Sequence, residues 1–408
     1  MVTEPLSAFR QLPFMGVIRV NDEAMREHGY RMGDPNWTNL GQGQPEAGEM
    51  PGAPPRICSI EIPAQDHGYG PIEGTPECRQ AIADYYKRTY NLDLGLENIA
   101  LAPGGRAALT RIGAIMEKVR LGYFTPDYTA YEDLMTTFPR IEPVWLELTP
   151  EKGFMMSPAD LEAHIKKENL GAVLISNPCN PTGAVLKGET LKGWLEVARR
   201  TNCVLIMDEF YSHYIYDGSD KPVSIAEFVV DIERDPVVIV DGLTKSFRYP
   251  GWRVGWVVAG SAVIRALCAA GSFLDGGPCR PIQQAAIKVL EQAQADQETK
   301  AVRAVFKRKR DLTIVALEAM GVEFPHAPQG TFYAFGYVGN LPAPLNTGLG
   351  FMRAAFTQKV LTVPGEFFDV NPNRQRTGES PLTPWVRFSF GPPEENLVAG
   401  LSRLRNLV

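Results

Sequence analysis

Lys245 lies in a segment whose residue types could support covalent chemistry on a carbonyl compound. The segment reads Asp241-Gly-Leu-Thr-Lys-Ser-Phe-Arg-Tyr-Pro-Gly-Trp-Arg253. A deprotonated and shielded lysine amine condenses with a carbonyl group to form a Schiff base. Arg253 follows across a Pro-Gly turn, and its guanidinium could bind a phosphate group. The pair could therefore hold an aldehyde that carries a phosphate; the alternative is a lysine and an arginine on an exposed loop.

A second segment, Asn177-Pro-Cys-Asn-Pro-Thr-Gly183, directly follows an apolar run. Prolines and glycine restrict the backbone of such a loop, so the amide of Asn180 could be held toward a ligand oxygen. The alternative is a rigid turn that only leads into the next helix.

A third segment, Asp208-Glu-Phe-Tyr211, follows another apolar run. A carboxylate at this place could pair with a protonated pyridine nitrogen and so preserve the ring charge of an electron-sink cofactor. Tyr211 could hydrogen-bond a phenolate oxygen on the same ring. An acidic strand end beside a half-buried tyrosine is the alternative.

A Gly-Gly turn in Leu101-Ala-Pro-Gly-Gly-Arg-Ala-Ala-Leu109 stands between a short predicted strand and a predicted helix. Glycines allow close backbone approach, and the free amides of a helix N-terminus attract an anion such as phosphate. With Arg253 as a second phosphate ligand, the segments together indicate pyridoxal phosphate as the cofactor.

The elements that must position these residues are apolar runs, at 172–176, 203–207 and 236–240. They read as buried strands, and each is followed by one of the polar segments. Ligands of open α/β sheets bind beyond the carboxyl ends of the strands, which favours one shared site.

Helical and strand patterns alternate from about residue 76, which predicts an α/β architecture with a mainly parallel sheet. A helix is expected from Pro76, and residues 283–318 read as nearly unbroken helix. A smaller α+β unit is expected after it, with strands at 330–335 and 385–390.

The expected organisation has three parts. They are an arm with little regular structure that contributes to the small domain and the substrate entrance (1–55), a large cofactor-binding domain (56–290) and a small C-terminal domain (291–408).

Composition narrows the classes of function. The chain has 408 residues, 44% apolar and 22% charged, and its formal charge of −6 argues against nucleic acid or an anionic membrane as partner. Six scattered cysteines and five histidines predict neither a metal site nor a disulfide framework. No apolar run approaches the ~20 residues of a membrane helix. No signal peptide is apparent, so a cytoplasmic location is expected.

Taken together, the segments resemble the class I/II aminotransferases, pyridoxal-phosphate enzymes of fold type I. The resemblance extends from about Leu40 to Phe390, with the motifs in the family's order. It implies a large domain whose mainly parallel seven-stranded sheet lies between helices, plus a smaller α+β domain.

The resemblance also implies roles around the cofactor. Lys245 would form the Schiff base and carry the proton between the substrate α-carbon and C4′ of the cofactor. Asp208 would pair with the pyridine nitrogen, while Asn180 and Tyr211 hold the phenolate oxygen. The expected phosphate ligands are Gly105 and Arg106, through their backbone amides, and Arg253.

Further residues match the family by position. Tyr128 would stack on the ring, although it could be a core tyrosine. The partner subunit's Tyr69 would reach the phosphate, which implies a homodimer with shared sites. Arg387 would bind the substrate α-carboxylate; a strand-edge salt bridge is the alternative. Gly43 and residues 15–18 would line the substrate entrance.

Three features depart from the family pattern. Gly242 stands where a serine usually helps to hold the phosphate. Arg106 stands where a small hydroxyl residue or glutamine is commoner; it could compensate for that hydroxyl or face the substrate. The polar segment 369–384 is longer than usual and could be a mobile lid.

The leading hypothesis is an aminotransferase that acts between an amino acid and a 2-oxo acid. Alternatives with the same cofactor are β- or γ-elimination, replacement, or an oxidative or ring-forming reaction of specialised metabolism. A cofactor-binding sensor is a further, non-enzymatic alternative. Asp275 and Arg280, near the expected subunit boundary, could select charged substrates or be ordinary surface residues.

Overall fold

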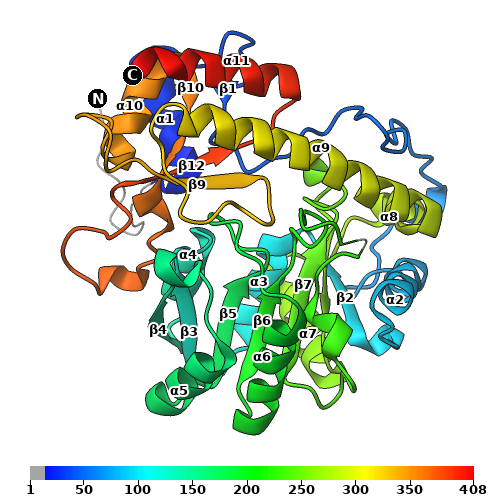
Figure 1. Ribbon diagram of the computed structural model, residues 1–408. Helices are drawn as coiled ribbons and strands as arrows, with labels where there is room; N and C mark the ends of the chain where they lie inside the picture. The colour runs from blue at the N-terminus through cyan, green and yellow to red at the C-terminus, as the bar shows by residue number, and fades with distance from the viewer. Residues whose placement is uncertain (1–13, 220) are drawn as a thin grey trace, which may run out of the picture.

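A seven-stranded sheet forms the centre of the larger part of the molecule, and its strand order is β2-β8-β7-β6-β5-β3-β4 (Figure 1). The computed structural model describes residues 14–219 and 221–408. The strands are β2 (Ile99–Ala102), β3 (Val119–Thr125), β4 (Ile141–Glu147), β5 (Ala172–Ser176), β6 (Val204–Asp208), β7 (Val237–Gly242) and β8 (Gly255–Val258). Neighbouring strands are parallel except at β8, which is antiparallel to both β2 and β7. The predicted α/β class and mainly parallel sheet are confirmed.

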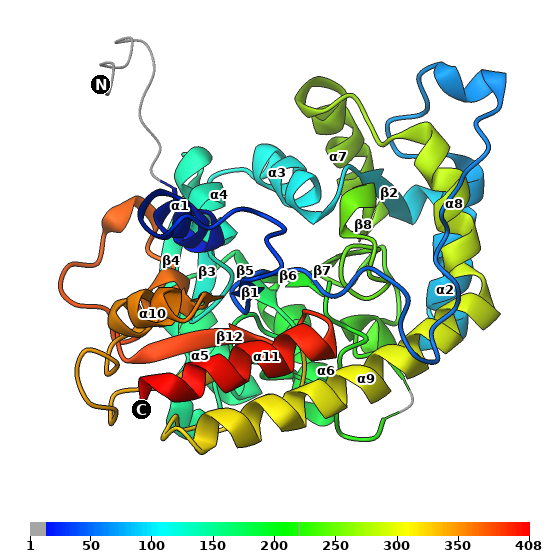
Figure 2. The same ribbon diagram turned by 90° about the horizontal axis from the view of Figure 1, so that it is seen from above.

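Helices cover both faces of this sheet. They are α2 (Pro76–Tyr90), α3 (Gly105–Ile115), α4 (Ala130–Thr137), α5 (Pro158–Glu168), α6 (Gly188–Thr201) and α7 (Ser261–Leu274). In the view from above, α3 and α7 lie on one side of the strands, and α5 and α6 lie on the other (Figure 2). Within β5, Val173 and Ile175 belong to one buried cluster, whereas Ala172 and Leu174 belong to the second. A strand buried on both faces explains why its sequence is a continuous apolar run.

Local sequence signals set the ends of several helices. The side chain of Thr75 accepts a hydrogen bond from the amide of Cys78, Pro76 begins α2, and Asn91 ends it in a left-handed conformation (φ 60°). Such a hydroxyl cap, an initial proline and a left-handed asparagine are the usual helix boundaries. The helix predicted from Pro76 is therefore confirmed.

The smaller part of the fold contains two short sheets. Its strands are β1 (Thr38–Asn39), β9 (Tyr333–Tyr337), β10 (Val360–Leu361), β11 (Val363–Pro364) and β12 (Trp385–Ser389), and its helices include α10 (Gly348–Thr357) and α11 (Glu394–Leu404). The antiparallel order is β11-β12-β9, and β1 pairs with β10 in parallel. The two strands predicted in this region are present, with boundaries shifted by a few residues. The three domain ranges themselves stay a prediction.

The structure refines two expectations about helices. The helix predicted at 283–318 is divided into α8 (Arg280–Leu290) and α9 (Gln292–Glu318), because Glu291 adopts an extended ψ of 139°. The arm was expected to have little regular structure, but its described residues 14–55 include α1 (Gly16–His28), which packs Val20 and Ala24 into the core. It contacts α10, β10 and β11. Its core-facing residues Val17, Val20 and Ala24 recur at helical spacing, so the periodic pattern is present within a region rich in glycine and proline.

Within 14–219 and 221–408, no helix combines the length and apolar character that crossing a membrane requires. In the same ranges, no group of three or more histidine, cysteine, aspartate or glutamate side chains is arranged to hold a metal ion. All six cysteines are free thiols.

Candidate active site

The polar segments singled out in the sequence meet at one edge of the large sheet. β5, β6 and β7 are adjacent and parallel, and Ser176, Asp208 and Val240 lie in register across them. The loops that follow carry Asn180 and Lys245. The expectation of one shared site beyond the strand ends is therefore met by the strand order.

Lys245 is surrounded by charged side chains that favour its neutral form. Its amine donates a hydrogen bond to the carbonyl oxygen of Gly43. Burial, together with the cations Arg387, Arg106 and Arg253, lowers the pKa of Lys245 to about 7, and the charge of Asp208 opposes this shift. A large share of these amines is deprotonated at neutral pH, as a nucleophile requires.

Asp208 ends β6 as a buried carboxylate that accepts a hydrogen bond from a tyrosine. The hydroxyl of Tyr131 donates to Oδ2 of Asp208 at 2.9 Å. The pKa of Asp208 is raised to about 6, because the effect of burial exceeds the opposing effects of the bonds from Tyr131 and the amide of Phe210 and of the charge of Lys245. A ring nitrogen that carries a proton would relieve the cost of this buried charge.

Arg387, on β12, is a buried cation in the same site. Its Nη1 donates to Oδ1 of Asn180 at 2.8 Å, and its Nη2 donates to the carbonyl of Gly41 at 2.5 Å. The guanidinium lies over the ring of Tyr333, 4.1 Å from its centroid. Its Nε is buried without a hydrogen-bond partner, and no acidic side chain of the described residues pairs with it. The expected alternative, a salt bridge at the strand edge, is thus absent from the described part of the chain.

Tyr211 and Gly43 approach each other through Tyr333. The hydroxyl groups of Tyr211 and Tyr333 are 2.9 Å apart, and both side chains are buried. A Cβ atom on Gly43 would lie 3.0 Å from the same Tyr333 hydroxyl. The structure therefore brings these two predicted residues together around a tyrosine that sequence reasoning did not select.

The predicted phosphate ligands also lie together. Gly104, with φ 87°, precedes Gly105 at the N-terminus of α3. A Cβ atom on Gly104 would lie 2.3 Å from Nη2 of Arg253, so the guanidinium lies directly against the Gly-Gly turn. Arg253 itself has a left-handed backbone, and its Nη1 donates to the carbonyl of Pro250 at 3.0 Å. A cation beside free helix amides is a suitable anion site.

Gly242 has a packing reason to lack a side chain. It pairs with Gly255 across β7 and β8. A Cβ atom on Gly242 would lie 2.5 Å from the carbonyl of Val254 and 2.7 Å from Cα of Gly255. The ring of Phe210 lies close to both Gly242 and Gly105. A serine would not fit here without movement of the backbone, which explains the departure from the family pattern.

The Arg106 side chain contacts the ring-stacking candidate. Its Nε donates to the hydroxyl of Tyr128 at 3.0 Å. The three atoms nearest to a Cβ atom on Gly242 would belong to Val254, Gly255 and Phe210. Tyr128 is half-buried, and its ring meets that of Tyr131 edge to face at 5.5 Å.

Other predicted residues lie outside this cluster. Tyr69 is fully exposed, as expected of a side chain that would act in a neighbouring subunit. Asp275 pairs with Arg111 at 2.6 Å, and Arg280 pairs with Asp66 at 2.8 Å. Both of these candidates for substrate selection are thus already in ion pairs within the chain.

The segment 369–384 is held against the large sheet. The amide of Asn371 donates to Oε2 of Glu132 at 2.8 Å. The guanidinium of Arg376 lies 4.6 Å from the ring centroid of Trp145. These contacts attach the segment to α4 and β4.

Sequence reasoning missed three side chains that complete the site, Tyr131, Phe210 and Tyr333. Tyr131 and Phe210 stand inside the segments that contain Tyr128 and Asp208, but a motif alone does not show which neighbour turns inward. Tyr333 stands in a predicted strand, and its contact with Tyr211 depends on how the two parts of the fold pack.

Comparison with known proteins decides the family. Residues 35–404 match aminotransferase class I and II. The chain belongs to this family. Aminotransferases of this class use pyridoxal phosphate, and this enzyme accordingly transfers amino groups from amino acids to 2-oxo acids.

Relatives of this aminotransferase match along most of its length. It is 30% identical over 382 residues to an aspartate aminotransferase of Pyrococcus abyssi, with 91% of each chain covered. It is 27% identical over 345 residues to an aspartate/prephenate aminotransferase of Thermus thermophilus, with 83% of each covered.

Solved structures share its fold at lower identity. Aspartate aminotransferase from Thermus thermophilus with maleate gives a TM-score of 0.79 at 24% identity, with both chains covered completely. An aminotransferase from Mycobacterium tuberculosis gives 0.80 at 22% identity, with 99% of each covered. These likenesses confirm the fold type I architecture of the aminotransferase.

Proposed function

We propose that this aminotransferase binds pyridoxal phosphate through Lys245 and acts on amino acids that carry a second carboxylate. One observation carries the proposal. The Lys245 amine, whose pKa is lowered to about 7, shares its site with Asp208 and with a buried Arg387 that has no acidic partner among the described residues.

The donor set supports this cofactor. The aldehyde would meet Lys245, the phosphate would lie at Gly105, the Arg106 amide and Arg253, and the ring nitrogen would meet Asp208. The remaining contacts would come from Tyr128 on the ring face and from Asn180 and Tyr211 at the phenolate oxygen. Asp208 ends β6, Asn180 and Lys245 follow the adjacent strands β5 and β7, and Gly105 and Arg106 begin α3 directly after β2.

Pyridoxal phosphate, when bound, supplies an aldehyde that condenses with amines and a ring that accepts electrons from a bond broken at the substrate α-carbon. Asp208 holds a proton on the ring nitrogen. Lys245 then moves one proton between the substrate α-carbon and C4′ of the cofactor, which requires its neutral form.

Arg387 binds the α-carboxylate of the substrate. Its unpartnered Nε offers a donor toward an incoming oxygen, and a guanidinium suits a planar carboxylate. Because Nη1 also donates to Asn180, the same side chain that binds substrate orients a ligand of the cofactor.

Arg106 is the candidate for a second substrate carboxylate. It is exposed and contacts Tyr128 through Nε, and no described acidic side chain forms an ion pair with it. Its charge lies close enough to Lys245 to lower the pKa of that amine. The relatives named as aspartate or aspartate/prephenate aminotransferases act, by their names, on dicarboxylic substrates.

The enzyme is expected to act as a homodimer. Tyr69 is fully exposed, and Phe273 is 75% exposed. Their segments adjoin, since a Cβ atom on Gly277 would lie 3.3 Å from Cα of Ile72. A second copy would cover these side chains and receive the partner subunit's Tyr69. A reducing, cytoplasmic setting agrees with six free cysteines.

A single-turnover experiment tests the function. Mixing the cofactor-loaded enzyme with aspartate or glutamate should release one equivalent of the 2-oxo acid, with the amino group retained until a second 2-oxo acid is added. Release of ammonia without an acceptor would instead assign the elimination class of reaction.

A further inference from the structure

Arg248 lies three residues after Lys245 and takes an unusual backbone conformation. Its φ of 58° is in the left-handed region, and its side chain is completely buried. Its amide donates to the carbonyl of Lys245 at 3.0 Å, which closes the turn that carries the amine. A long side chain in this region costs about 1 kcal/mol or more of strain.

The Arg248 guanidinium joins this turn to two other segments. Nε donates to Oε1 of Glu298 on α9 at 2.5 Å. Nη1 donates to the carbonyls of Glu46 and Gly48 at 3.0 and 2.9 Å. All of these partners are far from Arg248 in the sequence. Arg248 therefore fixes the turn against α9 and against the segment 46–48.

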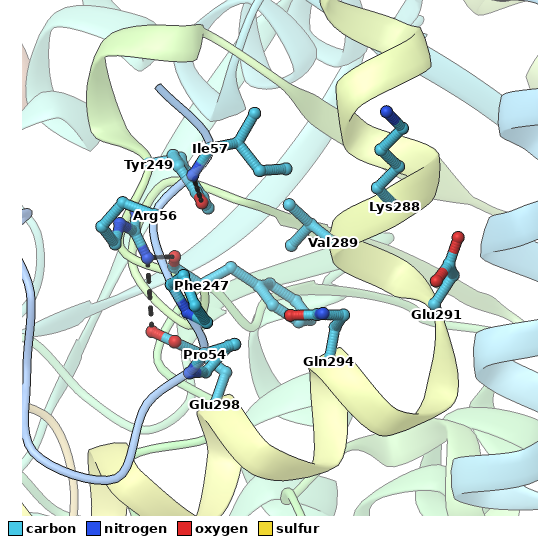
Figure 3. Close-up of a pocket in the computed structure, with 11 residues that line it drawn as sticks. Pro54, Arg56, Ile57, Phe247, Tyr249, Lys288, Val289, Glu291, Gln294 and Glu298 are labelled. Atoms are coloured by element: carbon cyan, nitrogen blue, oxygen red, sulfur yellow. Dashed lines mark hydrogen bonds and ion pairs between the residues drawn. The ribbon is translucent and has the colours of Figure 1, made fainter. Parts of the chain in front are cut away.

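Arg56 holds the other side of the same turn. Its Nη1 and Nη2 donate to the carbonyls of Phe247 and Arg248 at 3.3 and 2.7 Å. Its guanidinium lies 3.5 Å from the ring centroid of Tyr249 and 3.7 Å from Oε1 of Glu298. Figure 3 shows Arg56, Phe247 and Tyr249 lining a pocket together with Glu298 of α9 and Val289 of α8.

The segment that receives Arg248 also receives the Lys245 amine. Gly43 accepts a hydrogen bond from Nζ of Lys245, and Glu46 and Gly48 accept from Arg248. The turn is thus attached to residues 43–48 at two points, through the side chain of Lys245 and through that of Arg248. A buried charge pair is a poor source of stability, because desolvation offsets most of its attraction. Because Arg248 combines backbone strain with a buried charge, we infer that its role is to hold the Lys245 turn in one conformation.

We propose that Arg248, with Glu298 as its partner, is a positioning residue that fixes the Lys245 amine relative to the Gly43 carbonyl and the cofactor ring. This inference rests on the proposed role of Lys245. Arg248 acts through the turn and touches neither substrate nor cofactor.

The test compares cofactor-loaded variants. Arg248→Gly keeps a residue that adopts positive φ freely, so it removes the guanidinium without adding strain. Arg56 remains beside Glu298 in this variant. A double variant, Arg248→Gly with Glu298→Gln, removes both charges and serves if the single variant does not fold. Arg248→Lys retains the positive charge but lacks the several N–H donors of the guanidinium.

Two quantities separate positioning from mere stability. We expect kcat to fall about tenfold in Arg248→Gly and in the double variant, with the KM of the amino donor changed by less than about twofold. We also expect the pH midpoint of the lysine-bound chromophore to shift in Arg248→Gly and in the double variant. For Arg248→Lys, both kcat and this midpoint should lie between the values of those variants and the values of the native enzyme. Asp235→Asn is the matched control, because Asp235 pairs with Arg199 at 2.6 Å just before the opposite end of β7.

The outcomes are distinguishable. Suppose that Arg248→Gly or the double variant keeps the native kcat and the native pH midpoint of the chromophore, and only its melting temperature falls. That result would overturn the positioning role. Equal changes in Asp235→Asn would overturn it as well. Absence of any lysine-bound chromophore in the native enzyme would instead refute the proposed function of Lys245.

Discussion

Nη1 of Arg387 lies 2.8 Å from Oδ1 of Asn180, which joins a residue of β12 to the loop that follows β5. The two residues are far apart in the sequence; Arg387 lies in a strand of the smaller antiparallel sheet, and Asn180 lies in a loop that follows a strand of the large sheet. Through this bond, movement of Arg387 on binding the substrate carboxylate would be transmitted to Asn180, the proposed ligand of the cofactor's phenolate oxygen. The site is therefore completed only when the smaller part of the fold packs on the larger.

Arg387→Lys tests the carboxylate site. Lysine keeps the charge but cannot bind a carboxylate with two parallel donors while also bonding Asn180. We expect kcat/KM for amino donors to fall by roughly 100-fold, since about 3 kcal/mol of binding is lost with a charged bidentate contact. Steady-state kinetics check this, with Arg353→Lys, an exposed arginine paired with Glu23, as the control. Unchanged kinetics would remove Arg387 from the site.

Arg106→Gln tests the proposed substrate class. Glutamine can still contact Tyr128 but carries no charge, so donors with a second carboxylate should lose about 10- to 100-fold in kcat/KM. Donors with a neutral side chain, such as alanine, should change by less than about threefold. An equal loss for both kinds of donor would assign Arg106 to the cofactor alone.

Gly242→Ala tests the explanation of the missing serine. The added Cβ would lie 2.5 Å from the carbonyl of Val254, so we expect a loss of about 1–3 kcal/mol in the free energy of unfolding. Denaturant titration measures it. Gly251→Ala is the control, because a Cβ there meets no atom within 4 Å. If Gly242→Ala were as stable as the native protein, β7 and β8 could move apart to admit a side chain, and the steric explanation would be wrong.

The pH dependence of cofactor capture tests the charge environment of Lys245. A protonated amine is not a nucleophile, and burial with three neighbouring cations lowers the pKa of Lys245 to about 7. The rate at which the cofactor-free protein binds pyridoxal phosphate should therefore rise with pH, with a midpoint near 7, and level off above it. Stopped-flow absorbance checks this. A midpoint above about 9, close to that of a free lysine, would contradict it.

Much of the site could be predicted because its residues follow strands. Apolar runs buried on both faces are legible in the sequence, and parallel strands bring their carboxyl ends to one edge. Asp208, Asn180 and Lys245 could be placed together on that basis. The family resemblance added Arg387, whose position depends on the second sheet.

The remaining features depend on packing that a local pattern does not encode. Tyr333 meets Tyr211 only when the two sheets are assembled. Arg248 looked like an ordinary residue of a loop, yet its guanidinium is held by Glu298 and by backbone carbonyls far away in the chain. The break at Glu291 changes one ψ angle within a strongly helical sequence.

Reduction of the cofactor-loaded enzyme with borohydride, followed by peptide mapping, tests the role of Lys245 most directly. The account predicts that the cofactor is fixed to the peptide containing Lys245, and that Lys245→Ala gives no labelled peptide. Label on another lysine, or label that persists in Lys245→Ala, would contradict it.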